Sequence, residues 1–156
     1  MQLKKIVVGL ALNLALLSTA ANADILFNSM SGDVCSSVPG VWTGTGTVTA
    51  KVLGVNVKCQ YGGTALVTST SNPYVFSVDV SLNLISGICP SDEHLVLTGN
   101  CDSATGAFAL KSSEANLSGK VSEDGNTVEN LTGTVDIKIK GVTVTGHVSD
   151  MNLHKQ

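Results

Sequence analysis

The densest group of side chains that could do chemistry is Asp92-Glu93-His94, where two carboxylates and an imidazole follow one another. Carboxylate and imidazole groups are ligands that divalent cations accept in proteins, which makes these residues weak candidates for a metal site. Adjacent residues of a strand point to opposite faces, however, and cannot all face one ion. We therefore expect no metal and no cofactor.

Other catalytic groups have equally little support. His94 and His147 fall on the polar phase of their segments, and His154 lies among the last residues. No serine stands in a G-x-S-x-G elbow. We expect a protein that is not an enzyme. A small secreted hydrolase with a site built from the loop around residues 92–94 is the alternative, together with a purely structural surface protein.

Four cysteines, Cys35, Cys59, Cys89 and Cys101, predict two disulfides. No closely spaced C-x-x-C pair exists, which argues against a zinc site. Disulfides persist in oxidising compartments. Four cysteines allow three pairings. The sequential pairing is the simplest, and Cys59 with Cys101 is its rival, because both fall on the apolar phase of their segments.

The first 23 residues have the pattern of a secretory signal peptide. Lys4 and Lys5 precede an apolar run over residues 6–17, and Ala21-Asn22-Ala23 matches an A-x-A cleavage site. The run is shorter than the ~20 residues that a spanning helix needs. No later segment is long and apolar enough to span a membrane. We expect cleavage after Ala23 and a secreted or periplasmic protein.

The charge excludes one class of partner. Without Lys4 and Lys5 the chain holds seven lysines against twelve acids, a net charge of −5, and it has no arginine. Nucleic-acid-binding proteins use Lys and Arg to neutralise phosphates, so we expect no nucleic-acid partner. A protein or an apolar small molecule remains.

Residues 40–53 indicate how the chain folds. From Trp42 onward the even positions carry Trp, Gly or aliphatic side chains, and the odd positions carry Thr or Lys up to Leu53. Such alternation predicts a strand with one buried and one solvated face. Similar segments follow at 55–61, 64–70, 74–84, 94–101, 107–113, 116–122, 131–140 and 142–148, and a turn is expected at Gly62-Gly63. The apolar phase switches at Met151 and Leu153, which predicts a bulge or a docked tail.

These segments predict an all-β fold. Residues 24–40 form an irregular lead, and residues 41–156 form one domain, an antiparallel meander of eight or nine strands. An up-and-down β-barrel is expected, with a β-sandwich as the alternative. Glycine recurs at inward positions of five strands, and we expect it to serve barrel closure, because a missing side chain lets a sheet bend.

Gly40-Val41-Trp42 at the start of the first strand resembles the G-x-W signature of the calycins. These are the lipocalins, avidins and related small secreted barrels, including bacterial periplasmic lipocalin-like inhibitors. The resemblance implies a barrel in which Trp42 packs across the closed end. Lipocalins usually pair this Trp with an Arg from a late strand and add a C-terminal helix, whereas this chain has no Arg and no helical pattern near its end.

The sequence therefore predicts a non-enzymatic exported binding protein. It acts on a protein partner, as an inhibitor or a secreted host-facing factor does, or it holds an apolar small molecule in its interior. The candidates for ligand contact are the aromatic residues expected inside, Trp42, Tyr61, Tyr74, Phe76 and Phe108.

Overall fold

The computed structural model describes residues 32–156. The predicted signal peptide (1–23) and residues 24–31 of the predicted lead lie outside the described residues. The elements are the 3-10 helix η1 (Val34–Ser37) and the strands β1 (Gly40–Val52), β2 (Val55–Ser69), β3 (Val75–Ser86), β4 (Asp92–Cys101), β5 (Ala107–Lys111), β6 (Ala115–Val121), β7 (Thr127–Ile139) and β8 (Val142–Lys155). Among these residues, no helix has the length and apolarity to cross a membrane.

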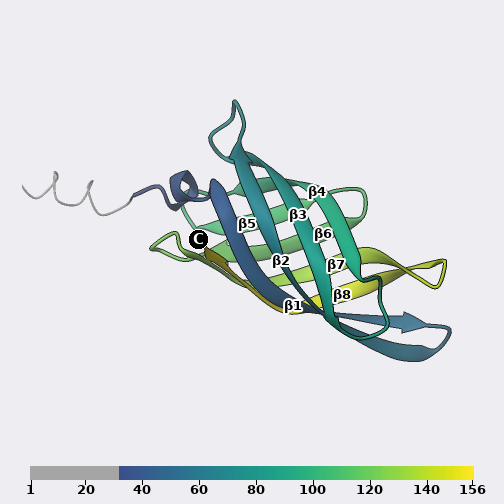
Figure 1. Cartoon of the computed structure of the whole chain (residues 1–156). Helices are drawn as coiled ribbons and strands as arrows, with labels where there is room; N and C mark the ends of the chain where they lie inside the picture. Colours follow the sequence, from purple (N-terminus) through teal and green to yellow (C-terminus); the bar gives the residue numbers. More distant parts are fainter. Residues whose placement is uncertain (1–31) are drawn as a thin grey trace, which may run out of the picture. The chain divides into compact units, whose positions relative to one another are not determined.

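The eight strands form one closed barrel (Figure 1). Each pairs antiparallel with the next, and β8 returns to pair with β1 from Trp42↔Lys155 to Ala50↔Gly146. The predicted meander and the barrel are confirmed, and the sandwich alternative is wrong. The inward faces supply the core, as alternation requires.

The turn predicted at Gly62-Gly63 is wrong. β2 continues through both residues, which pair with Thr45 and Gly44 on β1, so two predicted segments are a single strand. A Cβ at Gly63 would overlap the carbonyl oxygen of Ser81 on β3. Glycine is needed at position 63 for the close approach of two strands, and the sequence pattern was mistaken for a turn.

Inward glycines on other strands also admit neighbouring backbone. A Cβ at Gly44 would overlap the carbonyl oxygen of Asn152 on β8, and one at Gly133 would overlap that of Asn116 on β6. The contacts are made with adjacent strands, as expected for residues that let the sheet coil tightly.

The phase switch near the end of the chain is a β-bulge. Val148 pairs with Gly133 and Met151 pairs with Leu131, so two residues of β8 oppose one residue of β7. Asp150 within the bulge has φ 55°, a left-handed conformation that Asp tolerates better than most residues. The bulge turns Met151 toward the interior, where it lines the cavity described below.

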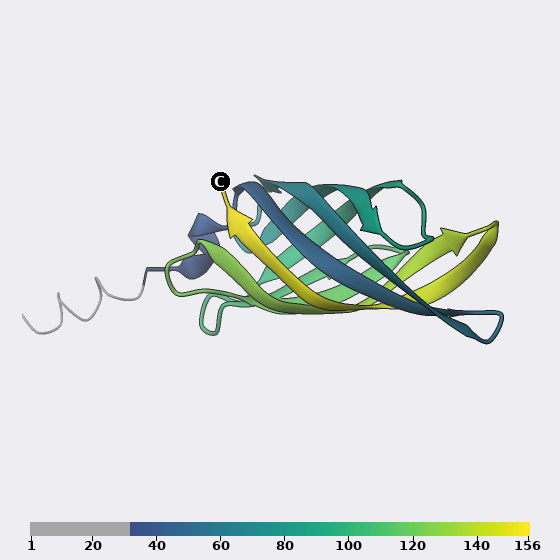
Figure 2. The ribbon, with the colours of Figure 1, turned by 60° about the horizontal axis from the view of Figure 1, so that its bottom comes forward.

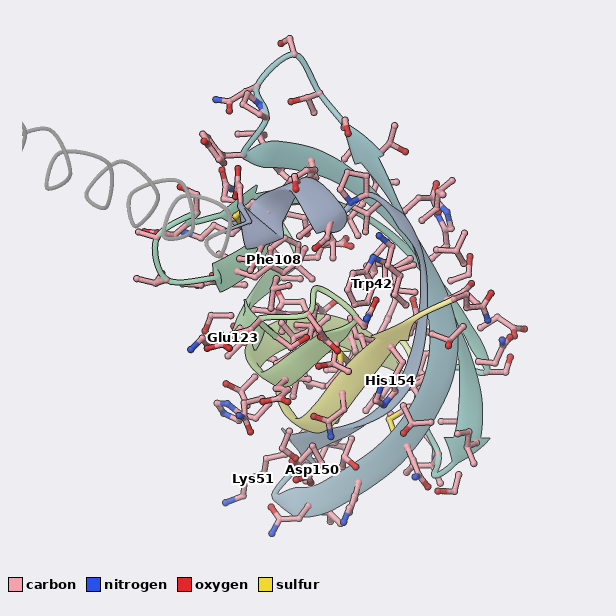
Figure 3. All side chains as sticks on the ribbon, turned by 90° about the vertical axis from the view of Figure 1, so that its left-hand side faces the viewer. Trp42, Lys51, Phe108, Glu123, Asp150 and His154 are labelled. Atoms are coloured by element: carbon pink, nitrogen blue, oxygen red, sulfur yellow. A yellow bond between two sulfur atoms is a disulfide. The ribbon has the colours of Figure 1, made fainter. Side chains whose placement is uncertain are left out.

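One end of the barrel is closed by η1 and Trp42. The Trp42 ring is 1% exposed, and its Nε1 donates a hydrogen bond to the Val38 carbonyl at 2.8 Å. Lys155, at the end of β8, donates from Nζ to the Ser37 carbonyl, and its Nζ lies 5.9 Å from the centroid of the Trp42 ring. A lysine therefore supplies the late-strand cation at this end, where the sequence offers no arginine. Viewed from the side of η1, Trp42 and Phe108 lie inside the ring of strands (Figure 3).

The disulfides are Cys35–Cys101 and Cys59–Cys89. This is neither the sequential pairing nor the Cys59–Cys101 rival, and both of those expectations are wrong. Cys101 ends β4 at the closed end, where η1 brings Cys35. Cys59 lies toward the other end, beside the β3–β4 loop that carries Cys89. Cys59 and Cys101 share the inward phase but belong to opposite ends of the barrel, beyond the reach of one disulfide.

We predict that the two disulfides stabilise the fold to a similar degree but affect Trp42 differently. They close loops of 66 and 30 residues, so replacing the pairs by serine should lower the free energy of unfolding by about 4.4 and about 3.6 kcal/mol, respectively. Only the Cys35→Ser/Cys101→Ser variant should shift the fluorescence of the single tryptophan toward that of a solvated indole, because it releases η1. An unshifted spectrum in that variant would show that η1 stays in place without its disulfide.

Candidate functional site

The end of the barrel opposite η1 has a gap in its wall. β5 and β6 are five and seven residues long, whereas β1, β2, β7 and β8 have 13 to 15 residues. β4 pairs with β5 only from Thr98 to Cys101. Within residues 32–156, the segments Asp92–Leu97 of β4 and Ile137–Ile139 of β7 consequently have no strand partner on the sides that face each other. We call the gap between these two segments the notch.

Backbone hydrogen-bonding groups point into the notch. The amide of Cys101 donates to the carbonyl of Tyr74, directly before β3, and that of Asp102 donates to the carbonyl of Ala107 on β5. Backbone direction alternates along a strand, so the odd residues of β4 bond to β3 and the even ones face β5. His94 and Val96 therefore direct their N–H and C=O groups into the notch.

The same alternation applies to β7. Its Asp136 amide donates to the Glu114 carbonyl, which ends the ladder with β6. Lys138, two residues further, directs its backbone groups into the notch. The notch is therefore bordered on both sides by strand edges of the kind that can accept another strand.

The interior behind the notch is apolar. Val80, Leu82, Leu84 and Leu95 point inward but are only partly buried, in contrast to the fully buried side chains around Trp42. A cavity of about 80 Å³ lies between the two regions, and its walls are almost entirely aliphatic and aromatic side chains and glycine backbone. Sites for small ligands usually occupy about 300–1,000 Å³. The cavity can hold a side-chain-sized apolar group.

Tyr61 and Glu93 are the polar groups at the mouth of this interior. The Tyr61 hydroxyl donates to the Pro90 carbonyl at 2.9 Å. Burial, and secondarily the negative charge of Glu93, raises the pKa of Tyr61 to about 12. The hydroxyl is therefore a neutral donor at physiological pH and fixes the loop after β3 to β2.

The three candidate metal ligands are not brought together. Glu93 lies on the inward phase and is half-buried, whereas Asp92 and His94 are exposed on the outside. His94 Nε2 lies 2.7 Å from Asp79 Oδ1 on the outer wall, and Asp92 accepts a hydrogen bond from Ser91. No group of three potential metal ligands occurs within residues 32–156.

The aromatic candidates separate into two groups. Trp42, Tyr61 and Phe108 line the cavity, and the Phe76 ring is buried with its centroid 6.4 Å from that of Phe108. Tyr74 was expected inside, but it lies in the turn before β3 and is 41% exposed. Its amide instead bonds to the side chain of Asn72, which defines that turn.

The sequence pattern did not predict the notch. The segments that become β5 and β6 are short in the alternation pattern, which was the available signal. Recognising a gap also requires the register of β4 against β5, and no single strand specifies it. No protein-family model matches the chain, and no curated protein sequence matches it.

We predict that amide hydrogen exchange will alternate along the first half of β4. The amides of His94 and Val96 should exchange at least about a hundredfold faster than those of Leu95 and Leu97, which bond to β3. Residue-resolved NMR measures this directly. Equal protection of all four amides would mean that another segment covers the notch.

The tyrosine at the mouth provides a pH test. Because the pKa of Tyr61 is raised from 10.0 to about 12, the stability linked to its proton is fully present below pH 10 and is lost as the pH rises toward 12. Tyr61→Phe should lower stability at neutral pH through loss of the bond to Pro90, but it should flatten the decline above pH 10. Denaturant titrations across this range measure both effects. If the stability of both proteins declined equally above pH 10, the raised pKa of Tyr61 would be contradicted.

Proposed function

We propose that this protein is an exported, non-enzymatic binding protein that takes an extended segment of a protein partner into the notch. The observation that carries the proposal is the arrangement of two strand edges on either side of a partly buried apolar interior. A strand added at such an edge gains main-chain hydrogen bonds, and its alternate side chains meet the barrel interior.

The size of the cavity favours a protein over an apolar small molecule. An engineered cavity of about 150 Å³ is sufficient for benzene, and the cavity here has about 80 Å³. A lipid tail would require the core around Trp42 to move. One aliphatic side chain of a bound strand requires only the existing space and the partly buried surface of Leu82 and Leu95.

The side chains of the described residues support binding more than catalysis. The closest acid and base pair, Asp79 and His94, lies on the exposed outer wall, with side chains that are 52% and 59% exposed. Catalytic groups are usually desolvated and placed beside the substrate site. The groups on the two strand edges are backbone amides and carbonyls, which bind a chain and do not transfer its atoms, and at the mouth of the interior the Tyr61 hydroxyl is already bonded to the Pro90 carbonyl.

Export rests on two features. Two disulfides are typical of proteins that fold in oxidising compartments. The leader pattern of residues 1–23 agrees with them. A barrel with a Trp at one end and a partner site at the other fits the likeness to calycin-type inhibitors, with Lys155 in the place of the missing arginine.

Panning of a random peptide library against the purified protein tests the proposal, with Val96 as the diagnostic position. Val96→Pro removes one amide that faces the notch, at an edge where proline is tolerated. Enriched peptides should bind the proline variant at least about tenfold more weakly, because the ring blocks a backbone bond and occupies the edge.

Val96→Thr is the matched control. It also removes the exposed valine side chain, but it keeps the amide and a β-branched shape, so peptide binding should stay within about twofold. Peptides that bind Val96→Pro as well as the original protein would place the site elsewhere. A lipid that co-purifies with the protein in native mass spectrometry would favour the small-molecule alternative.

A further inference from the structure

Two hairpins, β1–β2 and β7–β8, project beyond the rest of the barrel at the end opposite η1 (Figure 2). Their turns have the same geometry. Leu53 and Gly54 have φ 48° and 85°, and Lys140 and Gly141 have φ 50° and 83°. Two consecutive residues with positive φ in a two-residue loop define a type I′ turn. We call the exposed charged and apolar side chains within two residue pairs of these two turns the tip surface; it comprises Lys51, Leu53, Val55, Lys138, Lys140 and Val142.

Leu53 is poorly suited to its position if folding is the only requirement. The first loop position of a type I′ turn favours Asn, Asp or Gly, because side chains with larger branches are strained at positive φ. The side chain is also 92% exposed, and Val55 beside it is 65% exposed. Leu53 neither packs against the barrel nor suits the backbone conformation of its turn. An exposed apolar side chain of this kind indicates contact with something outside the barrel.

The charge of the tip surface is positive although the protein is acidic. Three of the seven lysines of residues 32–156 belong to it, and Lys58 lies further along the first hairpin, on which no acid occurs. On the second hairpin, Asp136 is the nearest acid, and it accepts a hydrogen bond from Thr145. Asp92, Glu93 and the exposed Glu114 lie toward the same end, at the start of β4 and in the β5–β6 turn, and the two hairpins project beyond these elements (Figure 2). At the closed end, the exposed turn charges are Asp102, Glu123 and Asp124.

We propose that the tip surface docks onto an anionic lipid surface, independently of the proposed partner site in the notch. Leu53, Val55 and Val142 would enter the headgroup region, and the flanking lysines would meet the negative charge. The apolar side chains stand on two separate convex turns. A fluid, flat and negatively charged layer complements that shape, whereas a protein partner would need two pockets at the correct spacing.

Co-sedimentation with vesicles tests this docking. The protein is purified after export, and its N-terminus is established by mass spectrometry so that an uncleaved apolar leader is not mistaken for the tip surface. It should bind vesicles of equal parts phosphatidylglycerol and phosphatidylcholine at low ionic strength. Binding should fall as salt is added and should be weak to phosphatidylcholine alone.

Leu53→Asn is the decisive variant because it suits the turn better than leucine does. Its thermal stability should be unchanged or higher, whereas its partition onto anionic vesicles should fall about tenfold. Lys51→Gln/Lys140→Gln should reduce partition by at least about tenfold as well. Leu66→Asn on the outer wall of β2, where Leu66 is 52% exposed, and Lys120→Gln are the matched controls and should bind as the original protein does.

Absence of binding to anionic vesicles would overturn the proposal, as would equal binding by Leu53→Asn. A second copy of the chain as the true occupant is a further contrary outcome. In that case sedimentation velocity would show self-association of the original protein that Leu53→Asn abolishes, without any dependence on lipid.

Discussion

The pairing of β1 with β8 is the constraint on which the rest of the molecule depends. The meander of eight strands buries its apolar face by closing, and closure brings the backbone of Asn152 against Gly44 too closely for a side chain at that glycine. The inward glycines are therefore a requirement of the architecture. Glycine lowers the strand propensity at these positions, but it admits the backbone of the neighbouring strand and so allows the sheet to curve.

The two ends of the barrel differ. At one end, η1, Trp42 and Lys155 form a lid that the Cys35–Cys101 disulfide holds in place. At the other, the short β5 and β6 leave a gap in the wall, and the long hairpins extend past it. The lid and the exposed strand edges therefore lie at opposite ends of the barrel.

Alternation in the sequence predicted the antiparallel meander, because period-two patterning encodes which face is buried, and the inward glycines favoured a barrel over a sandwich. The sequence pattern was misleading where the role of a residue depends on a contact with a distant strand. The glycines at 62 and 63 have the local signature of a turn, but their role is set by Ser81 on another strand. The disulfide pairing likewise depends on which end of the barrel each cysteine reaches. Within the candidate site, Tyr61 and Phe108 were predictable from their phase, whereas the notch depends on the register of strands that the sequence does not specify.

The closed end also sets the order in which the chain can fold. The lysine that contacts Trp42 lies 118 residues after the carbonyl that it binds, and Gln156 donates its amide back to Val41. Neither the lid nor the β1–β8 seam can form until this late segment of the chain is available. Until Lys155 and Gln156 are available, the strands that precede them can form only an open sheet, in which the β8 side of β1 is an unpaired edge.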